Sequence, residues 1–141
     1  MIVESVKKYF EELTSISVFN NAINVNYLDD EINYFSIEEI PTSPIIKRYA
    51  NGTTLRQYQF SLNSRAIYNE EILQNIENSG FYEKLCEEIE QKDNDGILPI
   101  LKGNKQAVNL EITSTPVIIS NDSTSAIYQI NFNLKYIKGV E

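Results

Sequence analysis

The stretch at 55–90 constrains the fold more than any other part of the chain, because its periodicity changes along its length. In its first third, apolar and polar residues alternate, which is typical of a strand with one buried face. From Ile72 onward, apolar residues recur every three or four positions, which is the spacing of a helix that packs against a core. An interruption of this helix is predicted at Ser79-Gly80, because glycine weakens helices and serine competes for backbone hydrogen bonds.

Both ends of this helix carry sequence signals. Asn69 is a favourable N-cap residue, and Glu70 and Glu71 follow it in the first turn, where the helix dipole favours negative charge. The polar run at 92–96 ends in glycine and is expected to stop the helix. The buried stripe is expected to consist of Ile72 and Ile76 before the interruption and of Phe81, Leu85 and Ile89 after it.

A helix and a hairpin are predicted before this stretch. Residues 31–40 have the bulky aromatic and β-branched composition of a strand. Asn51-Gly52 favours the positive φ angles of a tight hairpin turn, which would join a strand at 45–49 to a longer one at 53–67. At the N-terminus a helix is expected over 2–14, with one apolar stripe made of Val3, Val6, Phe10 and Leu13.

Two more strands are predicted near the C-terminus, at 108–112 and 128–136, where apolar and polar residues again alternate. Pro116 indicates that the first of them is bulged or lies at a sheet edge. The sequence therefore predicts an α+β fold, in which a mostly antiparallel sheet packs against an N-terminal helix and a central broken helix in the order α-β-β-β-α-β-β. No long linker is present in the 141 residues, so we expect a single domain over 1–141.

The composition restricts the chemistry that the chain can perform. There is no histidine, so the commonest general base near neutral pH and the commonest transition-metal ligand are both missing. The single cysteine, Cys86, has no histidine to activate it and is expected to be structural. Neighbouring acidic residues such as Glu87 and Glu88 diverge by about 100° on a helix, which disfavours a two-carboxylate site. We therefore expect no catalytic residue, no metal site and no cofactor.

The net charge of −8 argues against a protein that grips nucleic acid, because such binding depends on lysine and arginine at the phosphates. Solubility alone explains this charge, but an acidic surface could also line a passage for DNA, since it repels the backbone. The apolar runs are far shorter than the roughly 18 residues of a membrane span, so no membrane association is expected.

Six residues are candidates for contacts with other subunits or partners. Tyrosines at the ends of elements suit protein interfaces when they are exposed, although a place in the core is an equal alternative. Arg56 and Arg65 lie nine residues apart on one predicted strand, so they point to opposite faces. Either side chain could pair across a subunit boundary or cap the sheet edge. The candidates are Arg48, Tyr49, Arg56, Arg65, Tyr68 and Tyr82.

Several short motifs occur in a defined order between Tyr49 and Tyr136, over about two thirds of the chain. They are Tyr49, Asn51-Gly52, Arg56-Gln57-Tyr58 with Phe60, Ser64-Arg65, the segment 75–81, Leu98-Pro99, Gly103, Tyr128-Gln129-Ile130 and Leu134-Lys135-Tyr136. This ordered set resembles the tail terminator or "minor capsid" family of phages that infect Gram-positive bacteria. The aromatic residue and glycine that the family often shows near Pro116-Val117 are absent here.

The resemblance implies a structural role at the head-proximal end of the virion tail, after synthesis in the host cytoplasm. Tail terminators form a ring, typically of six subunits, that stops polymerisation of the tail tube and offers a docking surface to the neck. The implied partners are other copies of the chain, the tail tube protein, the neck or connector protein and, in contractile tails, the sheath protein. DNA would pass through without specific binding. A six-membered ring would carry a charge of roughly −48, part of which is expected to face the channel.

Two alternatives to a tail terminator stay open. A neck or head-completion protein would bind connector rings instead of tail tubes. A small cytoplasmic enzyme or ligand-binding domain that uses carboxylates would have a deep pocket and a saturable small ligand.

Overall fold

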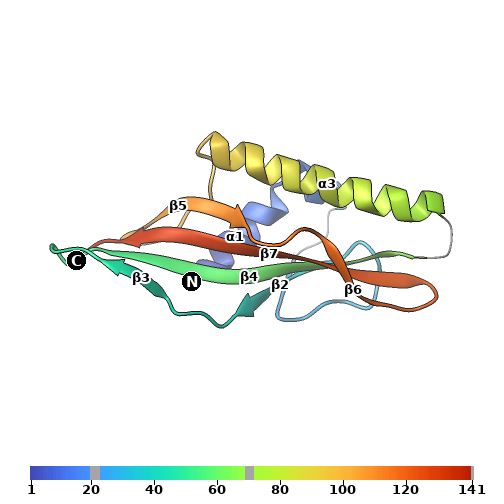
Figure 1. The fold of residues 1–141 in the computed structure, drawn as a ribbon, viewed down its shortest axis with the longest axis horizontal. Coiled ribbons are helices and arrows are strands. Elements are labelled where there is room, and N and C mark those ends of the chain that lie inside the picture. Colours follow the sequence, from blue (N-terminus) through green and yellow to red (C-terminus); the bar gives the residue numbers. More distant parts are fainter. Residues whose placement is uncertain (20–22, 69–71, 141) are drawn as a thin grey trace.

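Among the described residues, seven strands form one sheet, and three helices lie on one side of it (Figure 1). The computed structural model describes residues 1–19, 23–68 and 72–140. This arrangement confirms the α+β class. In chain order the elements are α1 (Ile2–Glu11), α2 (Thr14–Ser17), β1 (Asn24–Val25), β2 (Phe35–Ile40), β3 (Ile45–Arg48), β4 (Thr54–Ile67), α3 (Ile72–Asn94), β5 (Lys105–Ile112), β6 (Val117–Asn121) and β7 (Ser125–Lys138).

The two longest strands, β4 and β7, form the centre of the sheet. Each has 14 residues, and their antiparallel pairing runs without a register shift from Thr54 opposite Lys138 to Ile67 opposite Ser125. A slip of one residue would turn every apolar side chain of either strand to the other face, so the alternation holds this register. The strands predicted at 53–67 and 128–136 are confirmed, and the second extends beyond its predicted limits at both ends.

The sheet order is β1-β2-β4-β7-β5. β2 and β3 pair with the same edge of β4, at different positions along it. In the same way, β5 and β6 share one edge of β7. Only the short β1–β2 pairing is parallel among these ladders. The predicted hairpin between β3 and β4 is confirmed, and Gly52 in its turn has a φ of 91°, which favours glycine.

The core lies between the helices and one face of the sheet. The ring of Phe10 in α1 packs edge-on against Phe60 of β4 and Phe132 of β7, with centroid distances of 5.7 and 5.3 Å. α1 ends at Glu11, earlier than the helix expected over 2–14, and the chain continues into α2. The four residues of the predicted apolar stripe, Val3, Val6, Phe10 and Leu13, are all buried.

The predicted interruption at Ser79-Gly80 is wrong, because α3 runs unbroken from Ile72 to Asn94. A straight helix turns by about 100° per residue, so a single stripe faces the sheet along its whole length. Ile76 falls outside this stripe and is 60% exposed, contrary to the prediction that it packs on the core. The buried residues of the stripe are Asn78, Tyr82, Leu85 and Ile89, with Phe81 half-buried beside them.

The predicted end of α3 is confirmed. Gly96 has a φ of 75° and donates its N–H to the carbonyl of Asp93 at 3.1 Å, while the N–H of Ile97 reaches the carbonyl of Lys92 at 2.8 Å. These two bonds form a Schellman motif, which satisfies carbonyls that the helix end would otherwise leave unpaired. At the other end, the cap expected at Asn69, Glu70 and Glu71 lies outside the described residues, as does the side chain of Ile72.

Candidate interaction surfaces

The face of the sheet that turns away from the helices is polar. β4 and β7 place asparagine, glutamine and serine side chains there, alternating with the core residues of the other face. Asn133 donates its side-chain N–H to Gln57 at 3.1 Å, and Asn63 donates to Glu38 of β2. The centre of this face is therefore lined by amide and hydroxyl side chains.

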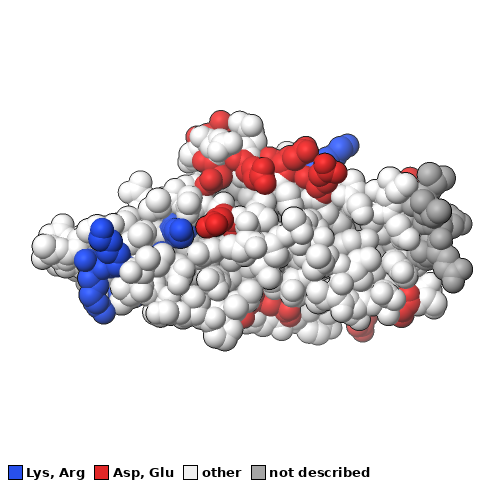
Figure 2. Space-filling model, in the orientation of Figure 1, with Lys and Arg blue, Asp and Glu red and all other residues white. Residues whose placement is uncertain are grey.

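Basic residues gather at one end of the sheet, at the left of Figure 2. The register puts Arg48, Lys138 and Lys105 in one row across the sheet, because Thr54 lies opposite both Arg48 and Lys138, and Lys138 lies opposite Lys105. Lys47 adds its charge beside this row, with its ammonium 5.2 Å from the centre of the Tyr49 ring. That distance is within the range of a cation–π contact.

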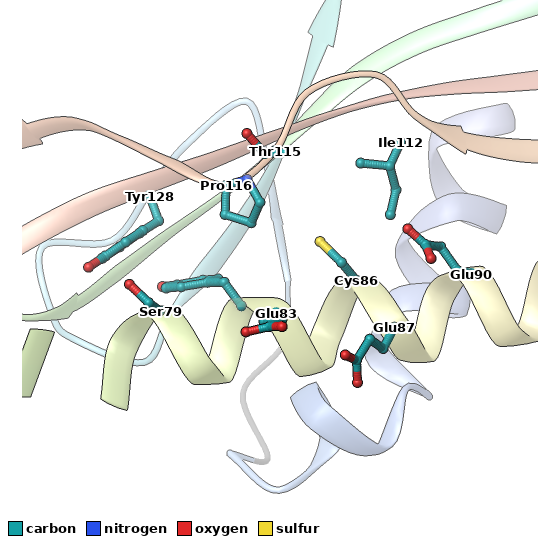
Figure 3. A pocket seen from close by; sticks show the side chains of 10 residues that line it. Ser79, Glu83, Cys86, Glu87, Glu90, Ile112, Thr115, Pro116 and Tyr128 are labelled. Atoms are coloured by element: carbon teal, nitrogen blue, oxygen red, sulfur yellow. The ribbon is translucent and has the colours of Figure 1, made fainter. Parts of the chain in front are cut away.

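Acidic residues gather along α3, in contrast to the basic end (Figure 2). The helix contains six acidic and only two basic residues. Glu83, Glu87 and Glu90 line a hollow of about 300 Å³ between α3 and the segment that connects β5 to β6. Pro116 and Ile112 form the opposite wall, and Figure 3 shows the three carboxylates along the helix below them.

Cys86 lies in this hollow, with its sulfur directed toward Pro116 and Ile112 (Figure 3). Burial, with a smaller effect of Glu90, raises the pKa of the Cys86 thiol to about 11. The thiol therefore stays protonated near neutral pH, and a protonated thiol is a poor nucleophile. This environment fits the structural role that the sequence predicts for Cys86.

β6 is an apolar strand with exposed side chains. Val117, Ile118 and Ile119 all face solvent in part, and every residue of the strand is exposed. Its pairing partner in the described chain is β7 alone, with a register shift between Ile118 and Ser120. The sequence prediction missed this strand, although its run of β-branched residues was the available signal. Of the two alternatives predicted from Pro116, a bulge there or an edge position, the edge position is confirmed for the strand at 108–112, since β5 ends the order and its register shift lies between Ala107 and Asn109.

Two of the six candidate interface residues lie at the basic end with exposed side chains, namely Arg48 and Tyr49. Arg56 lies nearby in β4, half-buried, and donates from Nε to the hydroxyl of Thr54 at 3.0 Å. The structure brings these three together, as neighbours on the β3–β4 hairpin.

The other three candidates lie elsewhere in the structure. Arg65 donates from Nε to the carbonyl of Asp29 at 3.1 Å and from Nη1 to Ser125 at 3.3 Å, so it secures a loop of its own chain. Tyr68 follows β4 and is half-buried. The prediction that Tyr82 lies at the end of an element is wrong, because it lies inside α3 and is 3% exposed. Its ring stacks on that of Tyr128, with the two ring centroids 4.3 Å apart.

No group of three or more acidic, cysteine or histidine residues is placed to hold a metal ion within the described ranges. None of the helices described is long and apolar enough to cross a membrane. Comparison with protein-family models and with curated protein sequences finds no match to this chain.

Proposed function

We propose that this chain is a structural virion protein, a ring-forming tail terminator that caps the head-proximal end of a phage or phage-like tail tube. Such a ring would stop polymerisation of the tube and offer a docking surface to the neck. The observation that carries the proposal is the placement of two strand edges, β3 and β6. They lie on opposite edges of one sheet and at opposite ends of its long central pair.

Surfaces that differ and lie at opposite ends of a protomer favour head-to-tail contacts, and such contacts close into a ring when the rotation per subunit fits. The charge distribution supports the same geometry, because the basic end and the acidic helix face are separate regions of the protomer (Figure 2). The ordered motifs between Tyr49 and Tyr136 support the tail terminator family as the source of such a ring.

The proposal is tested by electron microscopy of the purified protein mixed with tail tubes and, separately, with polymerising tube protein. We expect a ring at one end of each tube and a narrow distribution of tube lengths. Binding to connector rings without any effect on tubes would favour a neck or head-completion protein instead. Turnover of a substrate, with no binding to tubes or connectors, would favour the enzyme alternative.

The charge of the channel is a separate part of the proposal. α3 carries six acidic residues, so its orientation in the ring affects how much negative charge the channel presents to DNA. A density map of the assembled ring gives this orientation directly. A neutral or basic lumen would contradict this part while leaving the terminator proposal intact.

A further inference from the structure

We infer that β3 of one copy docks along β6 of the next copy. Neighbouring strand residues point to opposite faces, so the contact brings one of the two basic residues, Lys47 or Arg48, to the acidic side of α3. The inference rests on the proposed function, since it names the contact from which the ring would be built.

Exposed strand edges are templates for pairing with another chain, and proteins usually blunt them with charges, short lengths or bulges. β1 has only two residues, and β5 carries Lys105 and Glu111 as well as a register shift. β6 contains no charged residue among Val117–Asn121 and is blunted only by its bulge. Of the edge strands described, β6 is therefore the least protected and the best receptor for a partner strand.

β3 has the properties of a matching donor strand. It pairs only with β4 among the described elements, and Ile46, Lys47 and Arg48 are exposed. The two basic residues would repel a second β3 but would be neutralised by an acidic partner surface. The same side chains that block a β3–β3 contact therefore permit a contact with an uncharged edge that has acidic neighbours.

The surroundings of β6 are acidic. Pro116, immediately before the strand, shares its hollow with Glu83 and Glu87 of α3 (Figure 3), and Asp122 follows the strand directly. Exposed ion pairs contribute little affinity individually, whereas complementary charge sets the orientation of an encounter. We therefore assign affinity to strand pairing and apolar contact, and orientation to the charges.

The positions of the two strands make the contact heterologous. β3 pairs with Thr54–Arg56 at one end of β4, whereas β6 pairs with 126–129, near the opposite end of the central pair. A copy that donates β3 keeps its own β6 free for another copy, so the contact repeats head to tail. A symmetric β6–β6 contact would instead stop at a dimer.

The first test is site-directed cross-linking in a Cys86→Ala background. One chain carries Ile46→Cys and a second carries Ile119→Cys, and a short bismaleimide linker tolerates small shifts in register. We expect a cross-linked heterodimer from the mixture, and a ladder of oligomers when one chain carries both changes. Val108→Cys in place of Ile119→Cys is the matched control, since Val108 is 50% exposed on β5 and Ile119 is 49% exposed on β6. Equal yields for the two pairs, or a homodimer from Ile119→Cys alone, would overturn the inference.

The second test exchanges the charges. Lys47→Glu combined with Arg48→Glu is expected to lower the cross-linking yield about tenfold at low salt, because like charges would then face one another. Mixing that chain with one that carries Glu83→Lys and Glu87→Lys should restore the yield. Lys8→Glu on the exposed side of α1 is the control and should have no effect. No loss on reversal would overturn the assigned orientation.

The β3–β6 contact and the tail terminator function can be disproved separately. If the protein caps tubes but the β3–β6 cross-link does not form, even on tubes, the tail terminator proposal stands and this contact is wrong. If the cross-link forms but tubes grow to normal lengths without a cap, the contact stands and the terminator proposal is wrong.

Discussion

Glu88 of α3 caps the short helix α2 through Ser15: its Oε1 accepts hydrogen bonds from the backbone N–H of Ser15 at 3.0 Å and from its hydroxyl at 2.7 Å. The second carboxylate oxygen accepts from the N–H of Thr14 at 2.7 Å. A helix of four residues has almost no stability alone. The place of α2 therefore depends on a carboxylate that lies 73 residues further along the chain.

We expect Glu88→Gln to lower the free energy of unfolding by about 1 kcal/mol at neutral pH, as for the loss of a helix cap. Burial is the largest single influence and raises the pKa of Glu88, but the bonds from Ser15 and Thr14 together hold it below its ordinary value of 4.5. The contribution of Glu88 is therefore complete above pH 4.5 and is lost as the pH falls through the lower folded-state pKa.

Urea unfolding of both proteins at about pH 7 and about pH 3.5 measures this dependence. The difference between wild type and Glu88→Gln should shrink at the lower pH, because below pH 4.5 the unfolded chain binds a proton at Glu88 more readily than the folded protein does. An equal difference at both pH values would contradict the capping role.

Phe10 packs α1 against the two central strands of the sheet. It is fully buried against Phe60 and Phe132, so Phe10→Ala should lower the free energy of unfolding by about 3–5 kcal/mol. Chemical denaturation monitored by circular dichroism gives the value. Ile100→Ala is the control, because Ile100 is 87% exposed and its truncation should change stability by about 0.5 kcal/mol or less. Equal effects of the two changes would contradict the packing of α1.

Gly80 offers a direct test of the continuity of α3. A Cβ at this position would meet no atom within 4 Å, so Gly80→Ala should raise the free energy of unfolding by about 1 kcal/mol, which is the helix-propensity difference. Gly96→Ala is the matched contrast: with a φ of 75°, it should lower stability by about 1 kcal/mol. Thermal or urea unfolding measures both. A destabilised Gly80→Ala protein would favour a break in the helix.

The thiol of Cys86 should react slowly in the folded protein. Burial raises its pKa from 9.0 to about 11, so at pH 8 the reactive thiolate is about one hundredfold scarcer than for an ordinary cysteine. The rate of labelling by a disulfide reagent in native buffer and in denaturant measures this difference. Fast labelling of the folded protein would contradict the packing of Cys86 beside Pro116 and Ile112.

Helix α3 was predicted correctly in part of its length and wrongly at Ser79-Gly80. The periodicity correctly placed Leu85 and Ile89 in the core and the stop at Gly96, because these signals involve residues close together in sequence. It failed at Ser79-Gly80, where intrinsic propensity predicts an interruption. Packing of Asn78, Tyr82 and Leu85 on the sheet holds the helix continuous through the weak pair.

The candidate interaction surfaces were only partly predictable. Arg48, Tyr49 and Arg56 were named from the sequence and lie together at the basic end. The role of Lys138 and Lys105 in the same row depends on the pairing of β4, β5 and β7, which joins residues from distant parts of the chain. β6 was overlooked because an aliphatic run of three residues is too short to have a period.

Local residue patterns were sufficient to predict the two long central strands, the hairpin at Gly52, the apolar stripe of α1 and the α+β class. Each of these depends on a local period or on one residue's φ preference. Long-range packing and strand pairing account for the continuity of α3, the capping of α2 by Glu88, and the segregation of basic and acidic residues to different regions. Those features depend on contacts between segments that are far apart in the sequence. Such contacts cannot be predicted from the local pattern of residues, because paired strands can come from distant parts of the chain.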